Sequence, residues 1–340
     1  MKQNTIIFLV IVFFISLSQN VSANTDTSEG SPQAENSYTI SPTFGNSQKS
    51  ITSNFYDMTL SPNQEDVFKL TIKNQSNKNQ KFKINVNTAT TNTNVIVDYT
   101  KQSFKKDSSM KVSIKDLITP NSSDISVAAG KSETVDFKIH MPEQFFDGIL
   151  LGGITVKPIQ EEQSSTGIQN VYMHTLAIRV NETDKDVPAR IHGANVTIGQ
   201  ENQHNLVKML VRNPEARLLS QMDGHFFITK KNSAKKLVQK SEKNLSIAPN
   251  SEFYVPLLLK DSFKAGNYTY TVKIKNKDGE WKFSKDFKIS NGDAQKYNKT
   301  SLDNAESKTN DWLIYTIAFL IITWILIFVA YKLGKKRGSD

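Results

Sequence analysis

The sequence predicts an all-β protein with two tandem immunoglobulin-like β-sandwich domains and one C-terminal transmembrane helix. Three observations support this prediction. Segments with alternating apolar and polar residues recur through the centre of the chain, separated by polar turns. No comparable central segment has a helical period. One uncharged apolar segment near the C-terminus is long enough to cross a bilayer.

The N-terminal segment has the features of a secretory signal peptide. Lys2 precedes an apolar run at residues 6–17, and Val21-Ser22-Ala23 follows it with small residues at the spacing of a cleavage site. We therefore expect residues 1–23 to be removed. Residues 24–37 are polar and lack an apolar period, which is typical of a disordered leader.

Residues 38–158 are predicted to form the first sandwich. Alternation in residues 68–72, 82–86 and 135–141 gives each strand one buried face. Residues 148–156 are instead apolar on both faces and contain paired glycines, as expected for a central or bulged strand.

Residues 159–186 are interpreted as a linker followed by a closing strand. The first part is polar, whereas residues 171–180 are a strong strand candidate. We predict that this strand pairs with residues 154–158 and completes the first domain.

Residues 187–290 are predicted to form the second sandwich. Residues 268–275 alternate, and Asp278-Gly279 is a strong hairpin signal before the return strand. Both halves contain the same order of elements: a turn, a strand, a glycine-containing turn and a second strand. This repeat indicates either that the two domains are related or that the order is common to all β-sandwiches. The polar residues 291–311 are predicted to be a flexible stalk.

Residues 312–331 are predicted to span the membrane. They carry no charge, and at about 1.5 Å per residue they cover the roughly 30 Å hydrocarbon core. Trp312 and Tyr331 occupy the positions of interfacial aromatic residues. The tail 332–340 contains Lys332, Lys335, Lys336 and Arg337 and is expected in the cytoplasm. The alternative is a buried core helix.

The formal net charge of +9 is concentrated in the second domain. Residues 187–290 hold 15 Lys and 3 Arg against 9 acids, whereas residues 38–160 hold 14 Lys against 11 acids. A basic domain is attracted to anionic wall polymers or acidic host surfaces, unless its lysines only form a solvated face. An exported chain that is rich in Asn and Lys and lacks cysteine suggests a Gram-positive bacterium.

No catalytic, metal or cofactor motif is apparent. The five histidines form no HxxxH or HxH arrangement, and no nucleophile motif or phosphate-binding glycine loop is present. Sequence alone cannot pair the carboxylates of a wall hydrolase. We therefore predict a binding protein without cofactor, metal or nucleic-acid ligand, and a wall hydrolase is an alternative.

Two groups of residues are candidates for ligand binding. Amide and hydroxyl groups in residues 85–94 could bind amide and sugar groups of a glycopeptide, or the segment could be a solvated loop. Aromatic residues beside Asp147 could form a sugar-binding surface, or they could pack in the core beside a β-turn. The candidate residues are Asn87, Thr88, Thr90, Thr91, Phe145, Phe146 and Asp147.

Five stretches carry a family resemblance. They are residues 55–64 (FYDMTLSPNQ), 87–99, 146–154 (FDGILLGGI), 248–251 (APNS) and 265–268 (AGNY). Together with the order of signal peptide, two domains, membrane helix and basic tail, they resemble the WxL-interacting proteins. That family consists of surface proteins of lactobacilli, enterococci and relatives.

The resemblance implies that the first domain binds peptidoglycan and that the second binds host components, such as matrix or serum proteins. It also implies that the protein acts beside WxL-domain surface proteins. We expect a single-pass cell-membrane protein with extracellular domains that reach into the cell wall. The alternative is an assembly partner or chaperone for exported surface proteins, without direct wall binding, that pairs with a strand at a sheet edge.

Overall fold

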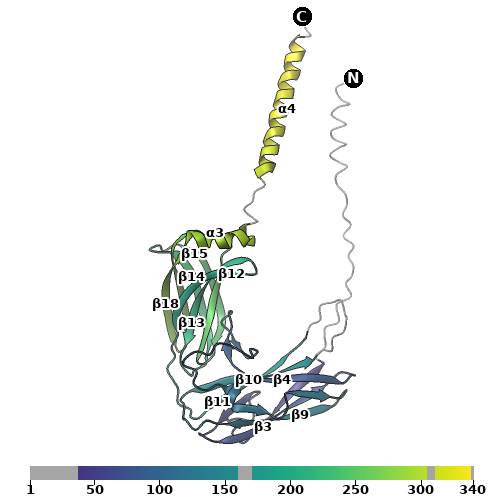
Figure 1. Cartoon of the computed structure of the whole chain (residues 1–340), viewed down its shortest axis with the longest axis vertical. Helices are drawn as coiled ribbons and strands as arrows, with labels where there is room; N and C mark the ends of the chain where they lie inside the picture. Colours follow the sequence, from purple (N-terminus) through teal and green to yellow (C-terminus); the bar gives the residue numbers. More distant parts are fainter. Residues whose placement is uncertain (1–36, 160–170, 305–310, 338–340) are drawn as a thin grey trace. The chain divides into compact units, whose positions relative to one another are not determined.

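The computed structural model describes residues 37–159, 171–304 and 311–337, and it describes no side-chain environment for residues 304, 311–314 and 331–337 (Figure 1). The predicted signal peptide, nearly all of the predicted leader and much of the predicted linker therefore lie outside the described residues.

The first sandwich packs a four-stranded sheet, in the order β1-β3-β9-β7, against a five-stranded sheet, in the order β2-β11-β10-β4-β8 (Figure 1). Neighbouring strands are antiparallel except β2 and β11, which are parallel. The strands are β1 (Tyr38–Thr43), β2 (Tyr56–Thr59), β3 (Glu65–Asn74), β4 (Gln80–Thr88), β7 (Ile118–Pro120), β8 (Asp124–Val127), β9 (Ser132–His140), β10 (Ile149–Ile159) and β11 (His174–Asn181). A small β5 (Thr90–Thr91) and β6 (Val97–Asp98) ladder and a short α2 (Ile114–Leu117) complete this domain.

Alternation along the strands builds the first core. Phe68, Leu70 and Ile72 of β3 are fully buried, as the period of two predicts. β10 is buried over most of its length, and a Cβ at Gly152 would lie only 2.2 Å from Ile114 and 2.5 Å from the backbone oxygen of Asn87. The predicted pairing with the closing strand is confirmed for residues 154–156, because these residues of β10 are antiparallel partners of residues 174–176 of β11.

The second sandwich packs a three-stranded sheet, in the order β12-β13-β16, against a four-stranded sheet, in the order β15-β14-β17-β18. The predicted hairpin turn at Asp278-Gly279 joins β17 to β18. The strands are β12 (His192–Glu201), β13 (His204–Asn213), β14 (Leu219–Lys230), β15 (Lys236–Ile247), β16 (Ser251–Leu258), β17 (Gly266–Asn276) and β18 (Gly279–Ile289).

The expected flexible stalk is wrong for residues 291–304. The helix α3 (Asn291–Thr300) and the 3₁₀ turn η1 (Leu302–Asn304) occupy this segment. Ser290 caps α3 by accepting a hydrogen bond from the Asp293 amide at 3.0 Å, and Gln200 Nε2 donates to the Tyr297 backbone oxygen at 2.6 Å. The polar composition of this segment gave no indication of the capped helix, which hydrogen-bonds to the second sandwich.

A last helix, α4 (Asp311–Arg337), contains the segment predicted to span the membrane. Among the residues that the structure describes, no helix is both long enough and apolar enough to cross a bilayer.

Candidate functional site

A cleft in the first sandwich lies beside β4, where this strand extends past its neighbour β8. β8 pairs with residues 80–83 of β4, and the Ile84 amide donates to the Ser123 backbone oxygen at 2.8 Å. Among the described strands, none pairs with residues 85–87 on that side. α2 and β7 contact β4 there instead, and the cleft has a volume of about 190 Å³. Its polar lining consists of Asn85, Asn87, Gln102 and Lys115, and Ile118 and Pro120 contribute apolar surface.

Asn87 is the buried polar residue of this lining. Its Nδ2 donates to the backbone oxygen of Tyr99 at 2.9 Å and to Oγ1 of Thr155 at 3.2 Å. Its Oδ1 is buried and has no hydrogen-bond partner among the described residues. A buried acceptor without a partner costs about 1–3 kcal/mol, so a ligand amide or hydroxyl that reached this oxygen would gain a favourable hydrogen bond.

The rim of the cleft adds one positive charge. Lys115 is exposed, and its Nζ donates to the backbone oxygen of Gln102 at 2.8 Å. Burial raises the pKa of Tyr99, so its hydroxyl stays protonated at neutral pH. The cleft therefore combines amide groups, an apolar wall and a cation, which suit acetamido, hydroxyl and carboxylate groups.

The predicted threonines are buried, and the structure disperses them instead of gathering them on one open surface. Thr88 Oγ1 lies 2.6 Å from Ser113 Oγ, and Thr90 Oγ1 donates to the Asp98 backbone oxygen at 3.4 Å. Thr91 Oγ1 lies 3.0 Å from Ser251 Oγ and accepts from the Ala248 amide at 3.0 Å. Their polar atoms form hydrogen bonds inside the protein, and these three side chains are not exposed to solvent.

Thr91 belongs to a contact between the two sandwiches that sequence reasoning missed. Val95 follows it in the turn between β5 and β6 and is buried in the hydrophobic core of the second sandwich. Arg212 of β13 holds the buried carboxylate of Asp107 with two hydrogen bonds, at 2.6 and 2.7 Å. We call Thr91, Val95, Asp107 and their partners Arg212 and Ser251 the interdomain joint.

Asp107 is ionised in the joint. Burial alone would raise its pKa, but hydrogen bonds from Arg212 and Ser109 and the charge of Arg212 lower the pKa to about 2. Because Asp107 and Arg212 lie 105 positions apart, no sequence pattern links them.

The second predicted group lies in the loop between β9 and β10. Phe145 is 51% exposed, whereas Phe146 packs against the first core. Asp147 Oδ2 pairs with Lys185 at 2.8 Å, and the Phe146 amide donates to Glu182 Oε2 at 3.1 Å. The two aromatic residues thus take different positions: Phe145 is exposed, whereas Phe146 is partly buried.

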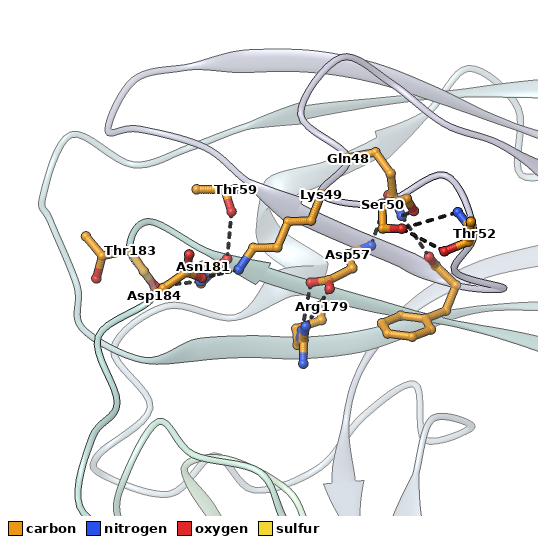
Figure 2. A network of polar contacts seen from close by, with 11 residues as sticks. Gln48, Lys49, Ser50, Thr52, Asp57, Thr59, Arg179, Asn181, Thr183 and Asp184 are labelled. Atoms are coloured by element: carbon orange, nitrogen blue, oxygen red, sulfur yellow. Dashed lines mark hydrogen bonds and ion pairs between the residues drawn. The ribbon is translucent and has the colours of Figure 1, made fainter.

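A polar network holds the chain segment that carries Glu182 and Lys185 (Figure 2). Arg179 of β11 donates from Nε to the buried Asp57 at 2.7 Å and also pairs with it through Nη2. Thr59 Oγ1 donates to Asn181 Oδ1 at 3.1 Å, and Lys49 pairs with Asp184. These contacts fix the end of β11 and so position the residues that contact the Phe145–Asp147 loop.

The predicted membrane-anchor residues fall in α4, where the structure does not describe their side chains. They are Trp312, Tyr331, Lys332, Lys335, Lys336 and Arg337. Within the described ranges, no group of three or more His, Cys, Asp and Glu side chains is placed to hold a metal ion.

The cleft residues were only partly predictable. Asn87 was expected to bind ligand, and it does line the cleft. Asn85 lies two positions earlier on the same face of β4, and this polar spacing could have identified it. Gln102 and Lys115 lie in the long connection after β6, and no spacing or motif in the sequence indicates that they line the cleft.

The fold and the cleft define a class of protein: two β-sandwich domains in tandem, with a cleft beside β4 in the first. A family model for the peptidoglycan binding domain of the WxL Interacting Protein matches residues 38–158, and one for its host binding domain matches residues 163–299. Together they cover more than half of the chain, which therefore belongs to the WxL-interacting protein family. The resemblance predicted from sequence is confirmed, and both matched families are binding domains.

Several solved structures match this chain at low similarity. The class 5 fimbriae chaperone CfaA is 12% identical with a TM-score of 0.29, and the match covers 67% of this chain and 95% of that chain. The E. coli chaperone DraB is 14% identical with a TM-score of 0.27, covering 69% and 94%. The Pseudomonas aeruginosa chaperone CupB2 is 10% identical with a TM-score of 0.26, covering 66% and 93%. No curated protein matches the chain.

Proposed function

We propose that this protein is anchored in the cell membrane and binds peptidoglycan through the cleft beside β4, while its second sandwich contacts host components. The family match supports both ligand classes. The observation that carries the assignment of the cleft is the buried Oδ1 of Asn87, which lacks a partner among the described residues and belongs to a lining residue.

Peptidoglycan has the chemical groups that this cleft would recognise. Its amino sugars carry acetamido and hydroxyl groups, and its stem peptides carry amides and carboxylates. Asn85, Asn87 and Gln102 offer amide donors and acceptors, while Lys115 offers a cation to a carboxylate. Ile118 and Pro120 provide apolar surface for a methyl group or a sugar face.

Co-sedimentation of the full-length, detergent-solubilised protein with purified peptidoglycan tests this site. The double variant Asn85→Ala/Lys115→Gln removes one amide and the cation, and we expect about tenfold weaker binding because charged hydrogen bonds contribute about 1.5–3 kcal/mol. Lys131→Gln is the control, because Lys131 is exposed in a turn away from the cleft.

Unchanged sedimentation of a folded double variant would contradict the assignment. Phe145→Ala provides the competing measurement. If this substitution alone abolished sedimentation, the binding surface would be the loop between β9 and β10 and not the cleft.

The anchor that we propose is α4. Its described side chains are mainly apolar and exposed, with Tyr315 and Trp324 each 74% exposed. An exposed apolar helix is stable when lipid surrounds it. The basic residues at its C-terminal end would remain on the cytoplasmic side.

A WxL-domain surface protein is the partner that we propose from the family membership. A pull-down from surface extracts tests this proposal. Recovery of a WxL-domain protein with retained wall binding supports joint action, whereas recovery of exported proteins without wall affinity would instead favour an assembly partner or chaperone.

A further inference from the structure

The outer face of the sheet β15-β14-β17-β18 carries an unusual arrangement of charge. Phe226 and Val272 point into the second core, so their strand neighbours His225, Phe227 and Lys273 face outward. Across the sheet, His225 lies opposite Lys273, and Lys273 lies opposite Lys282. Three basic side chains therefore form one row across three adjacent strands.

The flanking positions on this face are neutralised. Lys275 lies opposite Asp223 on one side and Glu280 on the other. Towards the opposite end of the sheet, Lys231 pairs with Asp286 at 2.8 Å. Among the described residues of this face, cations lie directly opposite one another only in the central row. Like charges in such positions destabilise a sheet.

An aromatic ring lies among these cations. Lys236 Nζ is 5.0 Å from the centre of the Phe227 ring, and Lys273 Nζ is 6.0 Å from the same ring. Lys236 Nζ also lies 3.0 Å from His225 Nε2. None of the ion pairs in the described part of the chain involves Lys236, Lys273 or Lys282. We call Phe227, His225 and these three lysines the basic aromatic patch.

A hollow of about 320 Å³ adjoins the patch at His225 and Lys273. Asp223, Glu242 and Glu280 also line the hollow, and so do Lys243 and Lys275. These carboxylates have lysine neighbours, because Lys275 lies opposite Asp223 and Glu280 and Lys240 pairs with Glu242 at 3.2 Å. An anionic group would therefore be held by Lys236, Lys273 and Lys282, whose charges have no carboxylate partner among the described residues.

We propose that the basic aromatic patch binds an acidic polysaccharide, with a pyranose ring against Phe227 and sulfate or carboxylate groups held by Lys236, Lys273 and Lys282. This inference rests on the proposed host-contacting role of the second sandwich. The lysines attract any polyanion, but the partly exposed ring adds apolar contact that a sugar ring can use. A linear polyphosphate without rings cannot use that contact.

Binding of the full-length, detergent-solubilised protein to immobilised heparin oligosaccharides tests the proposal. We expect Lys273→Gln to weaken binding about tenfold, since it removes a charge-assisted hydrogen bond. Phe227→Leu keeps an apolar side chain but removes the flat ring, and its loss of affinity should persist at high salt, where charge attraction is screened.

Lys275→Gln is the matched control, because it removes a lysine from the same face and strand where two acids already oppose the charge. Its affinity should stay within about twofold of wild type, since a compensated charge attracts a polyanion weakly. Inorganic polyphosphate is the second probe, and its affinity for the protein should not change in the Phe227→Leu variant. Thermal melting verifies that every variant is folded.

Two outcomes would overturn the proposal. The first is an equal loss of heparin affinity in Lys273→Gln and Lys275→Gln, and the second is unchanged heparin binding in Phe227→Leu. Either result would show that the patch attracts any polyanion and does not recognise a sugar ring. Host matrix extract serves as a separate ligand. Matrix binding that survives all variants would refute this patch and leave the proposed function standing, whereas a wild-type protein that binds neither matrix nor heparin would refute both.

Discussion

Single residues in the interdomain joint have unusual physical environments. Val95 has a positive φ of 59°, which is strained for a β-branched residue, yet its side chain is buried in the second core. Asp107 is a fully buried carboxylate whose charge is matched by the two-point contact from Arg212. Burying a charge in this way is favourable only while the partner remains in place.

The pH dependence of the joint follows from Asp107. Its pKa is about 2 in the folded protein against 3.8 for the unperturbed group, so its ionised form stabilises the folded state above about pH 4. This contribution is lost as the pH falls through about 2. By linkage the shift corresponds to about 2 kcal/mol at neutral pH.

We therefore expect Asp107→Asn to lower the free energy of unfolding by at least about 2 kcal/mol at pH 7, with a difference that shrinks below pH 4. Denaturant unfolding at several pH values measures this. Asp116→Asn is the control, because Asp116 forms an exposed ion pair with Lys106 and should contribute less than about 1 kcal/mol. A pH-independent effect of Asp107→Asn would show that charge is not its role.

At the scale of elements, β10 organises the first sandwich. It lies between β11 and β4, and its side chains are mostly buried. The sequence predicted this central position from apolar residues on both faces. It did not predict that the same domain would hold a cleft, because the cleft depends on where β8 stops pairing with β4.

Two isoleucines of β10 allow a matched test of its burial. Ile154 is 0% exposed and Ile159 is 43% exposed. We expect Ile154→Ala to destabilise the protein by about 2–5 kcal/mol, because it leaves a cavity in the core. Ile159→Ala should cost less than about 1 kcal/mol. Similar unfolding midpoints for the two variants would contradict the central role of β10.

At the scale of the whole molecule, the core of the second sandwich includes residues from the segments on both sides of it in sequence. The first sandwich contributes Val95 to its core, and α3 contributes Ala294. The Ser246 amide donates to the Val95 backbone oxygen at 2.9 Å. The two binding domains are therefore joined by specific contacts in addition to the connecting chain.

The proposed anchor predicts where the protein is found in the cell. A chain that ends at residue 304 lacks α4, and we expect it in the culture medium instead of the membrane fraction. A chain that lacks only residues 338–340 is the control and should remain in the membrane. Immunoblots of fractionated cells measure both. Retention of the chain ending at 304 in the membrane would show that another segment anchors the protein.

The sequence by itself determined the strand-rich fold, the order of two domains and the family, because alternation and short motifs are local properties of the chain. It also identified Asn87 as a polar residue of interest. Only the tertiary structure decided what surrounds that residue, because Tyr99, Gln102, Lys115 and Thr155 are brought to it by strand pairing and by the connection after β6. The same reason applies to α3, which is too polar to show a helical period and is held by its cap and by contacts with distant strands. Local patterns specify elements, whereas contacts between distant residues create the surfaces that bind.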